Sequence, residues 1–96
     1  MEMIEVLRKT KTDEDETYNF VLQISAFLRE TRKLVLPKGG EKEILVTCKA
    51  IIPVLNVDIK GSDRIAINGK CFSIADIKKN IISRLTTLYL KEVVNA

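Results

Sequence analysis

Apolar and polar residues alternate along much of the chain, and this alternation predicts strands. From residue 18 to residue 28 every second position is apolar: Tyr18, Phe20, Leu22, Ile24, Ala26 and Leu28. A period of two places these side chains on one face of a half-buried strand. The same stretch also fits a helical spacing, which remains the alternative, but we expect a strand.

Two further apolar runs flank a pair of glycines. Residues 33–37 and 43–53 are rich in strand formers, and Gly39-Gly40 between them predicts a turn that joins two strands. In the second run the residues that share one face are Ile44, Val46, Cys48, Ala50 and Ile52. Pro53 has no backbone N–H to donate to a neighbouring strand, so we expect this strand to end there.

The sharpest local signal is Asn68-Gly69, which lies between two short apolar runs. Asn-Gly tolerates the positive φ angles that a two-residue type I′ hairpin turn requires. Closure by these two residues pairs Ile67 with Lys70. It also brings four apolar residues of the two arms to one face: Ile65, Ile67, Phe72 and Ile74. Asn68 and Gly69 are therefore predicted to form a structural hairpin turn.

Residues 74–92 fit either of two structures. Ser73 and Asp76 match a capping box, and the following apolar residues match a helical stripe. The strand formers of residues 84–90 and the turn-like sequence of residues 78–80 favour strands instead. We expect a final strand here, with a C-terminal helix after Ser73 as the alternative.

Together these segments predict an all-β fold. We expect a small β-barrel or sandwich of six to seven short antiparallel strands, with a long acidic loop at residues 10–17. The chain has 96 residues, of which 46% are hydrophobic and 30% are charged. This length and composition are typical of one globular domain, spanning residues 1–96.

The amino-acid composition excludes most common catalytic mechanisms. Histidine is absent, which excludes imidazole acid–base catalysis and the zinc sites that need imidazole. Cys48 and Cys71 are the only cysteines, and both lie in apolar stretches, where we expect reduced, buried thiols. We therefore expect no enzyme, no catalytic residues, no cofactor and no metal site.

The densest group of acidic side chains comprises Asp13, Glu14, Asp15 and Glu16. A calcium-binding EF-hand loop that began at Asp13 would need Gly and Glu at its sixth and twelfth positions, where this chain has Tyr18 and Ile24. The match to a calcium loop therefore fails. Four adjacent carboxylates on a loop are predicted either to be solvated or to make an electrostatic contact.

Charge is distributed unevenly along the chain. Residues 1–20 hold three basic and six acidic side chains, so that they carry −3 and residues 21–96 carry +6 of the overall +3. This asymmetry predicts two different contact surfaces. Lys78, Lys79 and Arg84 offer a phosphate cradle, but only Phe27 and Tyr89 are expected on an outer face, which is few aromatic side chains for stacking on nucleic acid.

No targeting segment is evident at the start of the chain, and no apolar run approaches the length of a membrane span. We therefore expect no membrane contact. The protein is expected to be made and kept inside a cell, or packed into a particle that is assembled there.

The second half of the chain contains a series of local features in a fixed order. It comprises a turn, an Asp-Arg-Ile sequence, a hairpin at Asn-Gly, an aromatic-x-Ile sequence and a closing strand of alternating apolar residues. These are residues 58–65, 67–70, 72–74, 77 and 84–90. The series resembles tailed-phage head–tail connector proteins, that is, the head-tail joining, head-closure and minor capsid adaptor families. The charged loop at residues 10–17 is similar to theirs, whereas the tryptophan often found in the first half of joining proteins is missing.

The resemblance implies a structural virion protein of a tailed bacteriophage or prophage, made in the host bacterial cytoplasm and located in the virion neck. Its copies would form a ring between portal and tail that seals the packaged double-stranded DNA. The implied partners are the portal or adaptor protein, tail proteins and neighbouring copies. Asp13 to Glu16 would then face the channel or an adjacent ring. The rival hypothesis is a cytoplasmic small-barrel module that binds nucleic acid or a protein partner.

Overall fold

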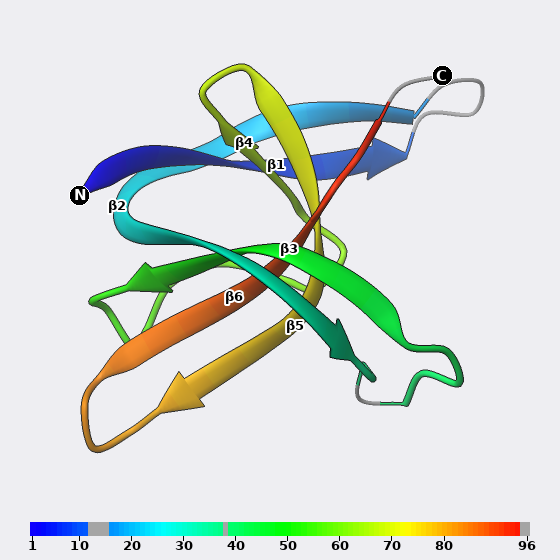
Figure 1. Ribbon diagram of the computed structural model, residues 1–96. Coiled ribbons are helices and arrows are strands. Elements are labelled where there is room, and N and C mark those ends of the chain that lie inside the picture. Colours follow the sequence, from blue (N-terminus) through cyan, green and yellow to red (C-terminus); the bar gives the residue numbers. More distant parts are fainter. Residues whose placement is uncertain (12–15, 38, 95–96) are drawn as a thin grey trace.

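The computed structural model describes residues 1–11, 16–37 and 39–94, which form six strands and no helix (Figure 1). The strands are β1 Glu2–Lys11, β2 Glu16–Val35, β3 Ile44–Ile52, β4 Arg64–Ile67, β5 Lys70–Asn80 and β6 Leu85–Glu92. The predicted all-β fold is confirmed. The segment after Ser73 continues as β5, turns and returns as β6, so the prediction of a final strand is correct and the helical alternative is not.

All neighbouring strands are antiparallel, and their pairing closes into one ring. The order around the ring is β1-β2-β3-β6-β5-β4, with β4 paired back to β1. This last seam is short, because only Glu5–Leu7 of β1 pair with Arg64–Ala66 of β4. The chain between β3 and β4 crosses to reach this seam. Within this connection, the Val54 carbonyl oxygen accepts a hydrogen bond from the buried Thr86 hydroxyl of β6 at 2.7 Å.

Strand β2 is 20 residues long and serves both halves of the ring. Its first half pairs with β1 and its second half, from Phe27 onward, pairs with β3. Figure 1 shows the cyan strand curling sharply between the two halves. The sequence predicted two separate strands here. A register irregularity between Glu30 and Lys33 instead lets one strand bend without ending.

A second irregularity explains one wrong prediction. Val6 pairs with Leu22 and Leu7 pairs with Phe20, so Val21 is an extra residue on β2. An extra residue reverses the alternation of faces. Phe20 is therefore 61% exposed, contrary to the prediction, while Val21 packs against the core. Four other residues of the predicted face do pack in or against the core: Leu22, Ile24, Ala26 and Leu28. Tyr18 instead lies against Arg64, whose guanidinium is 5.5 Å from the ring centre.

The interior contains two groups of buried side chains. The larger is built from β1 to β6: Ile4, Val6, Ala26, Ala50, Ile52, Ile65, Ile67, Phe72, Leu88 and Leu90. The smaller comprises Val35, Val46, Ala75 and Tyr89. Burying one such aliphatic side chain contributes roughly 1.5–3 kcal/mol, so these clusters are the main source of the stability of the ring.

The predicted turns are present. Asn68 and Gly69 have φ angles of 49° and 80°, and Ile67 pairs with Lys70, which confirms the two-residue hairpin. In the connection from β2 to β3, the Gly40 N–H donates to the Pro37 carbonyl oxygen at 2.9 Å. Strand β3 ends at Ile52, immediately before Pro53, as expected.

Candidate interaction surfaces

Most of the acidic stretch singled out by the sequence lies outside the described residues. The loop predicted at residues 10–17 is shorter than expected, because Thr10 pairs with Thr17 and Lys11 pairs with Glu16 between β1 and β2. Asp13, Glu14 and Asp15 belong to the part of the chain that is not described, and for Glu16 only the backbone is described, at the start of β2 opposite Lys11. Whether these carboxylates are solvated or make an electrostatic contact therefore stays a prediction. Asn68 and Gly69, the other predicted pair, lie together at the tip of the β4–β5 hairpin, where Asn68 Nδ2 donates to Glu2 Oε2 at 3.2 Å.

The two cysteines are free and only half-buried, so they are more accessible than expected. Cys48 packs against the larger core cluster. Burial raises the pKa of the Cys48 thiol, and the nearby charges of Glu30 and Glu2 raise it further. Because the thiolate is the nucleophile, a raised pKa makes Cys48 a poor one at neutral pH.

Two further kinds of feature are absent from the described residues. No group of three or more His, Cys, Asp or Glu side chains among them is placed to hold a metal ion. In the same part of the chain, no helix is long and apolar enough to cross a membrane.

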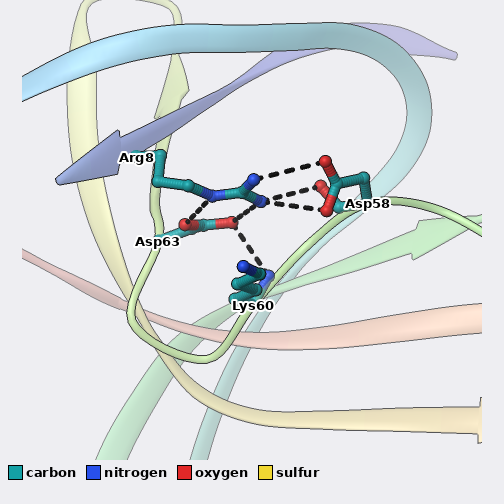
Figure 2. Close-up of polar contacts among 4 residues, drawn as sticks. All are labelled: Arg8, Asp58, Lys60 and Asp63. Carbon is teal, nitrogen blue, oxygen red and sulfur yellow. Dashed lines mark hydrogen bonds and ion pairs between the residues drawn. The ribbon is translucent and has the colours of Figure 1, made fainter. Parts of the chain in front are cut away.

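A cluster of charged side chains fastens the β3–β4 connection to β1. Arg8 of β1 donates from Nε to Asp63 Oδ1 at 3.0 Å and from Nη2 to Asp63 Oδ2 at 2.9 Å (Figure 2). Asp63 precedes β4 and is only 1% exposed. Its Oδ2 also accepts the Lys60 N–H at 2.8 Å, so the buried carboxylate is satisfied by both a charge and the backbone.

The same guanidinium holds a second, exposed carboxylate. Arg8 Nη1 lies 3.2 Å from Asp58 Oδ2 and Nη2 lies 3.1 Å from Asp58 Oδ1. Figure 2 shows Arg8 between the two carboxylates. The hydrogen bonds from Arg8, and then its charge, lower the pKa of Asp58, and the two carboxylates raise the pKa of Arg8.

These contacts have a structural role. Leu7 pairs with Arg64 at the end of the short β1–β4 seam, and Arg8 and Asp63 are the next residues on each side. The ion pair therefore extends the seam where backbone pairing stops. No sequence pattern pointed to Arg8, and Asp63 stood out only within the series that resembles connector proteins.

Three lysines surround one tyrosine on the sheet formed by β2, β3, β6 and β5. The ammonium groups of Lys33, Lys49 and Lys78 lie 5.4, 5.9 and 5.4 Å from the ring centre of Tyr89. Tyr89 is therefore only 9% exposed rather than a free outer aromatic side chain. Within the described residues none of these three ammonium groups forms an ion pair. We call this group the Tyr89 lysine cluster.

The turn between β5 and β6 exposes two large apolar side chains. Ile81 and Ile82 are 77% and 97% exposed. The Asn80 side-chain oxygen accepts the N–H groups of Ile82 and Ser83, both at 3.1 Å, and Arg84 completes the turn with a φ of 57°. We call Ile81 and Ile82 the tip. A hollow that reaches Lys78, Lys79 and Tyr89 lies beside it.

A groove of about 850 Å³ lies at the opposite end of the β5–β6 hairpin. Its apolar lining comprises Leu28, Leu45, Cys48 and Phe72. Its charged lining comprises Glu2, Glu30, Glu92, Arg29, Arg32 and Lys70. Lys70 Nζ lies 3.9 Å from Glu92 Oε1, which is a long and exposed ion pair. We refer to this feature as the groove.

Several large apolar side chains of the described residues are exposed to solvent. Large apolar side chains are exposed on several elements: Met3, Phe20, Phe27, Leu34, Leu36, Leu45, Val54, Ile81, Ile82 and Val94. No protein-family model and no curated protein sequence matches this chain.

Proposed function

We propose that this chain is a structural virion protein of a tailed bacteriophage or prophage, and that its copies form a ring between portal and tail. The observation that carries the proposal is the unit formed by residues 58–90. The residues that resemble connector proteins fold into one continuous piece, which consists of the Asp63 turn, the Asn68-Gly69 hairpin and the closing strand β6.

The exposed apolar side chains support the proposal independently. A subunit of a ring touches two neighbouring copies and the layers above and below it, so it needs several contact surfaces. Tip, groove and the exposed phenylalanines of β2 lie on different parts of the molecule. In this role the partners are the portal or adaptor protein, tail proteins and neighbouring copies, and packaged DNA passes close by.

The charge asymmetry fits the same role. A channel for DNA must not grip phosphate, because each contact between a basic side chain and a phosphate releases counterions and adds affinity. Carboxylates have the opposite effect. In the proposed ring, Asp13 to Glu16 face the channel or an adjacent ring, and the basic remainder of the chain faces acidic patches on the partners.

Light scattering coupled to size exclusion tests the proposal. The purified chain is expected to be largely monomeric in dilute solution and to form a ring when a portal ring is added. A stable closed oligomer without the portal, or the absence of assembly on portal and adaptor rings, would contradict it.

The second candidate function is a cytoplasmic small-barrel module that binds nucleic acid, and the Tyr89 lysine cluster favours it. Three ammonium groups without described ion-pair partners converge on one surface, as in a site for phosphate. Titration with single-stranded and duplex DNA tests this function. Binding that weakens steeply with salt, and that is lost when Lys33, Lys49 and Lys78 are all replaced by Gln, would favour it over the virion proposal.

A further inference from the structure

We propose that the Tyr89 lysine cluster and the tip form one docking surface, and that its occupant is an acidic segment of a partner protein that also carries apolar side chains. The inference rests on the proposed function only for the identity of that partner, which is then the portal, an adaptor or a tail protein. The surface itself is argued from side chains of β2, β3, β5, β6 and the turn between β5 and β6.

One hollow joins the cluster to the tip. It has a volume of about 580 Å³, and its lining includes Lys78 and Tyr89 of the cluster and both isoleucines of the tip. Lys79 lines it as well, and none of the described residues around it is acidic. A ligand in this hollow therefore meets ammonium groups and aliphatic side chains at the same time.

The charge of this surface is not neutralised within the described part of the chain. The Tyr89 ring attracts the ammonium groups of Lys33, Lys49 and Lys78, but like charges gathered around one ring repel one another. Neither these three side chains nor Lys79 forms an ion pair with another described residue. A bound anion relieves this repulsion, so the surface selects a negatively charged partner.

Two further polar groups leave the surface open to a carboxylate. Asp76 is in register with Tyr89, but its Oδ1 accepts the Ile77 N–H at 2.9 Å and forms no ion pair with a described lysine. The Tyr89 hydroxyl makes no hydrogen bond within the described residues. Because no described side-chain oxygen is both buried and unpartnered, this hydroxyl reaches solvent and is able to donate to an incoming anion.

The tip distinguishes an acidic protein segment from nucleic acid. Ile81 and Ile82 are 77% and 97% exposed, and two hydrogen bonds to the Asn80 side chain hold their turn. Apolar side chains of a protein remove these isoleucines from water, whereas a phosphate backbone is charged and polar. Tyr89 is only 9% exposed, which leaves too little of its ring free for a base to stack on.

Binding of defined peptides to the full chain, followed by fluorescence anisotropy, tests this surface. The first probe has four glutamates with two leucines at each end, the second has serines in place of the leucines, and the third has lysines in place of the glutamates. A short duplex DNA is the fourth probe. At about 0.15 M salt we expect the first peptide to bind at least about fivefold more tightly than each of the other probes.

Two variants locate the binding. Lys33→Gln with Lys78→Gln removes two ammonium groups of the cluster, and Ile81→Ser with Ile82→Ser removes the apolar tip. All four side chains are exposed, so the thermal midpoint is expected to stay unchanged. We expect each variant to bind the first peptide at least about fivefold more weakly than the unchanged chain.

Lys60→Gln with Lys70→Gln is the matched control, because it removes the same charge from exposed side chains before β4 and at the start of β5. We expect a loss below about twofold. An equal loss in this control would show a general attraction to net charge and overturn the inference. Equal affinities for the leucine and serine peptides would overturn it too, and so would tighter binding of duplex DNA, which would favour the nucleic-acid function.

Assembly on a portal ring separates this inference from the proposed function. If the first peptide binds as expected but the unchanged chain assembles on no portal or adaptor ring, the docking surface stands and the connector function is wrong. If the unchanged chain assembles on a portal ring but binds the first peptide no better than the other probes, the docking surface is wrong and the connector function stands.

Discussion

At the scale of single residues, a few polar groups decide how the ring closes. The seam between β1 and β4 has only three residue pairs, and Arg8 and Asp63 continue it with side chains. A buried carboxylate is tolerated only when it is paired and hydrogen-bonded, and Asp63 is both. The closure of the β-sheet therefore depends on a contact between residues 55 positions apart in the sequence.

Replacing Asp63 tests this contact. Asp63→Ala removes both hydrogen bonds from Arg8 and leaves the Lys60 N–H without its partner. We expect the free energy of unfolding to fall by about 3 kcal/mol, measured by urea denaturation. Asp58→Asn is the control, since Asp58 is exposed and its loss should matter far less. Equal effects of the two changes would mean that Asp63 is not the group that holds the seam.

The exposed partner of Arg8 gives a dependence on pH. Arg8 lowers the pKa of Asp58 in the folded protein, so the folded state favours the ionised carboxylate. The stabilisation is present above the unfolded pKa of about 4 and is lost as the pH falls through the lower folded value. We expect the urea midpoint of the unchanged protein to decline on acidification below about pH 4, and the urea midpoint of the Asp58→Asn variant to decline less steeply. If the two midpoints declined equally steeply with falling pH, this assignment would be contradicted.

Gly69 is one of two described glycines, with Gly39, whose backbone conformation favours glycine. Its φ is +80°, and a Cβ atom there would meet no neighbouring atom, so conformation alone sets the cost. Gly69→Val is expected to destabilise the protein by about 1–2 kcal/mol in thermal or urea unfolding. Gly61→Val is the matched control, because Gly61 also has open space around it but no positive φ. Similar losses at both positions would show that left-handed strain is not the cause.

At the scale of elements, alternation and turn chemistry predicted most of the strands. The Asn68-Gly69 hairpin and the buried face of β3 depend on local sequence, so local patterns were sufficient for them. The continuity of β2 and the outward position of Phe20 depend on register irregularities, which are set by partner strands and leave no trace in the periodicity. Local patterns also did not predict the Arg8–Asp63 ion pair, because the two residues are distant in the sequence.

The contact surfaces were harder to predict than the strands. Phe27 was correctly expected on the outer face, but Tyr89 is covered by lysines that come from three other strands. Ile81 belonged to the apolar stripe of the helical alternative and Ile82 to no predicted face, and the turn between β5 and β6 places both side chains in solvent. Which apolar residues stay exposed is a property of the assembled sheet, so periodicity alone does not reveal it.

At the scale of the whole molecule, the proposal assigns different tasks to differently charged regions. Residues 1–20 carry −3, and the basic remainder includes the Tyr89 lysine cluster. Replacing Asp13, Glu14, Asp15 and Glu16 together by Asn or Ser removes the acidic stretch. We expect lower infectivity and weaker DNA retention in particles that carry this change, because a less negative collar hinders the passage of DNA. Unchanged titre and retention would remove any role for the stretch in the ring.

The central claim is that this chain forms a ring between portal and tail. A localised electron cryomicroscopy reconstruction of the neck of assembled particles tests it most directly. The account predicts a ring of copies of this six-stranded β-sheet between the two, with the β4–β5 and β5–β6 hairpins recognisable in each copy. A neck whose density is fully accounted for by other chains, in particles that lack this one, would contradict it.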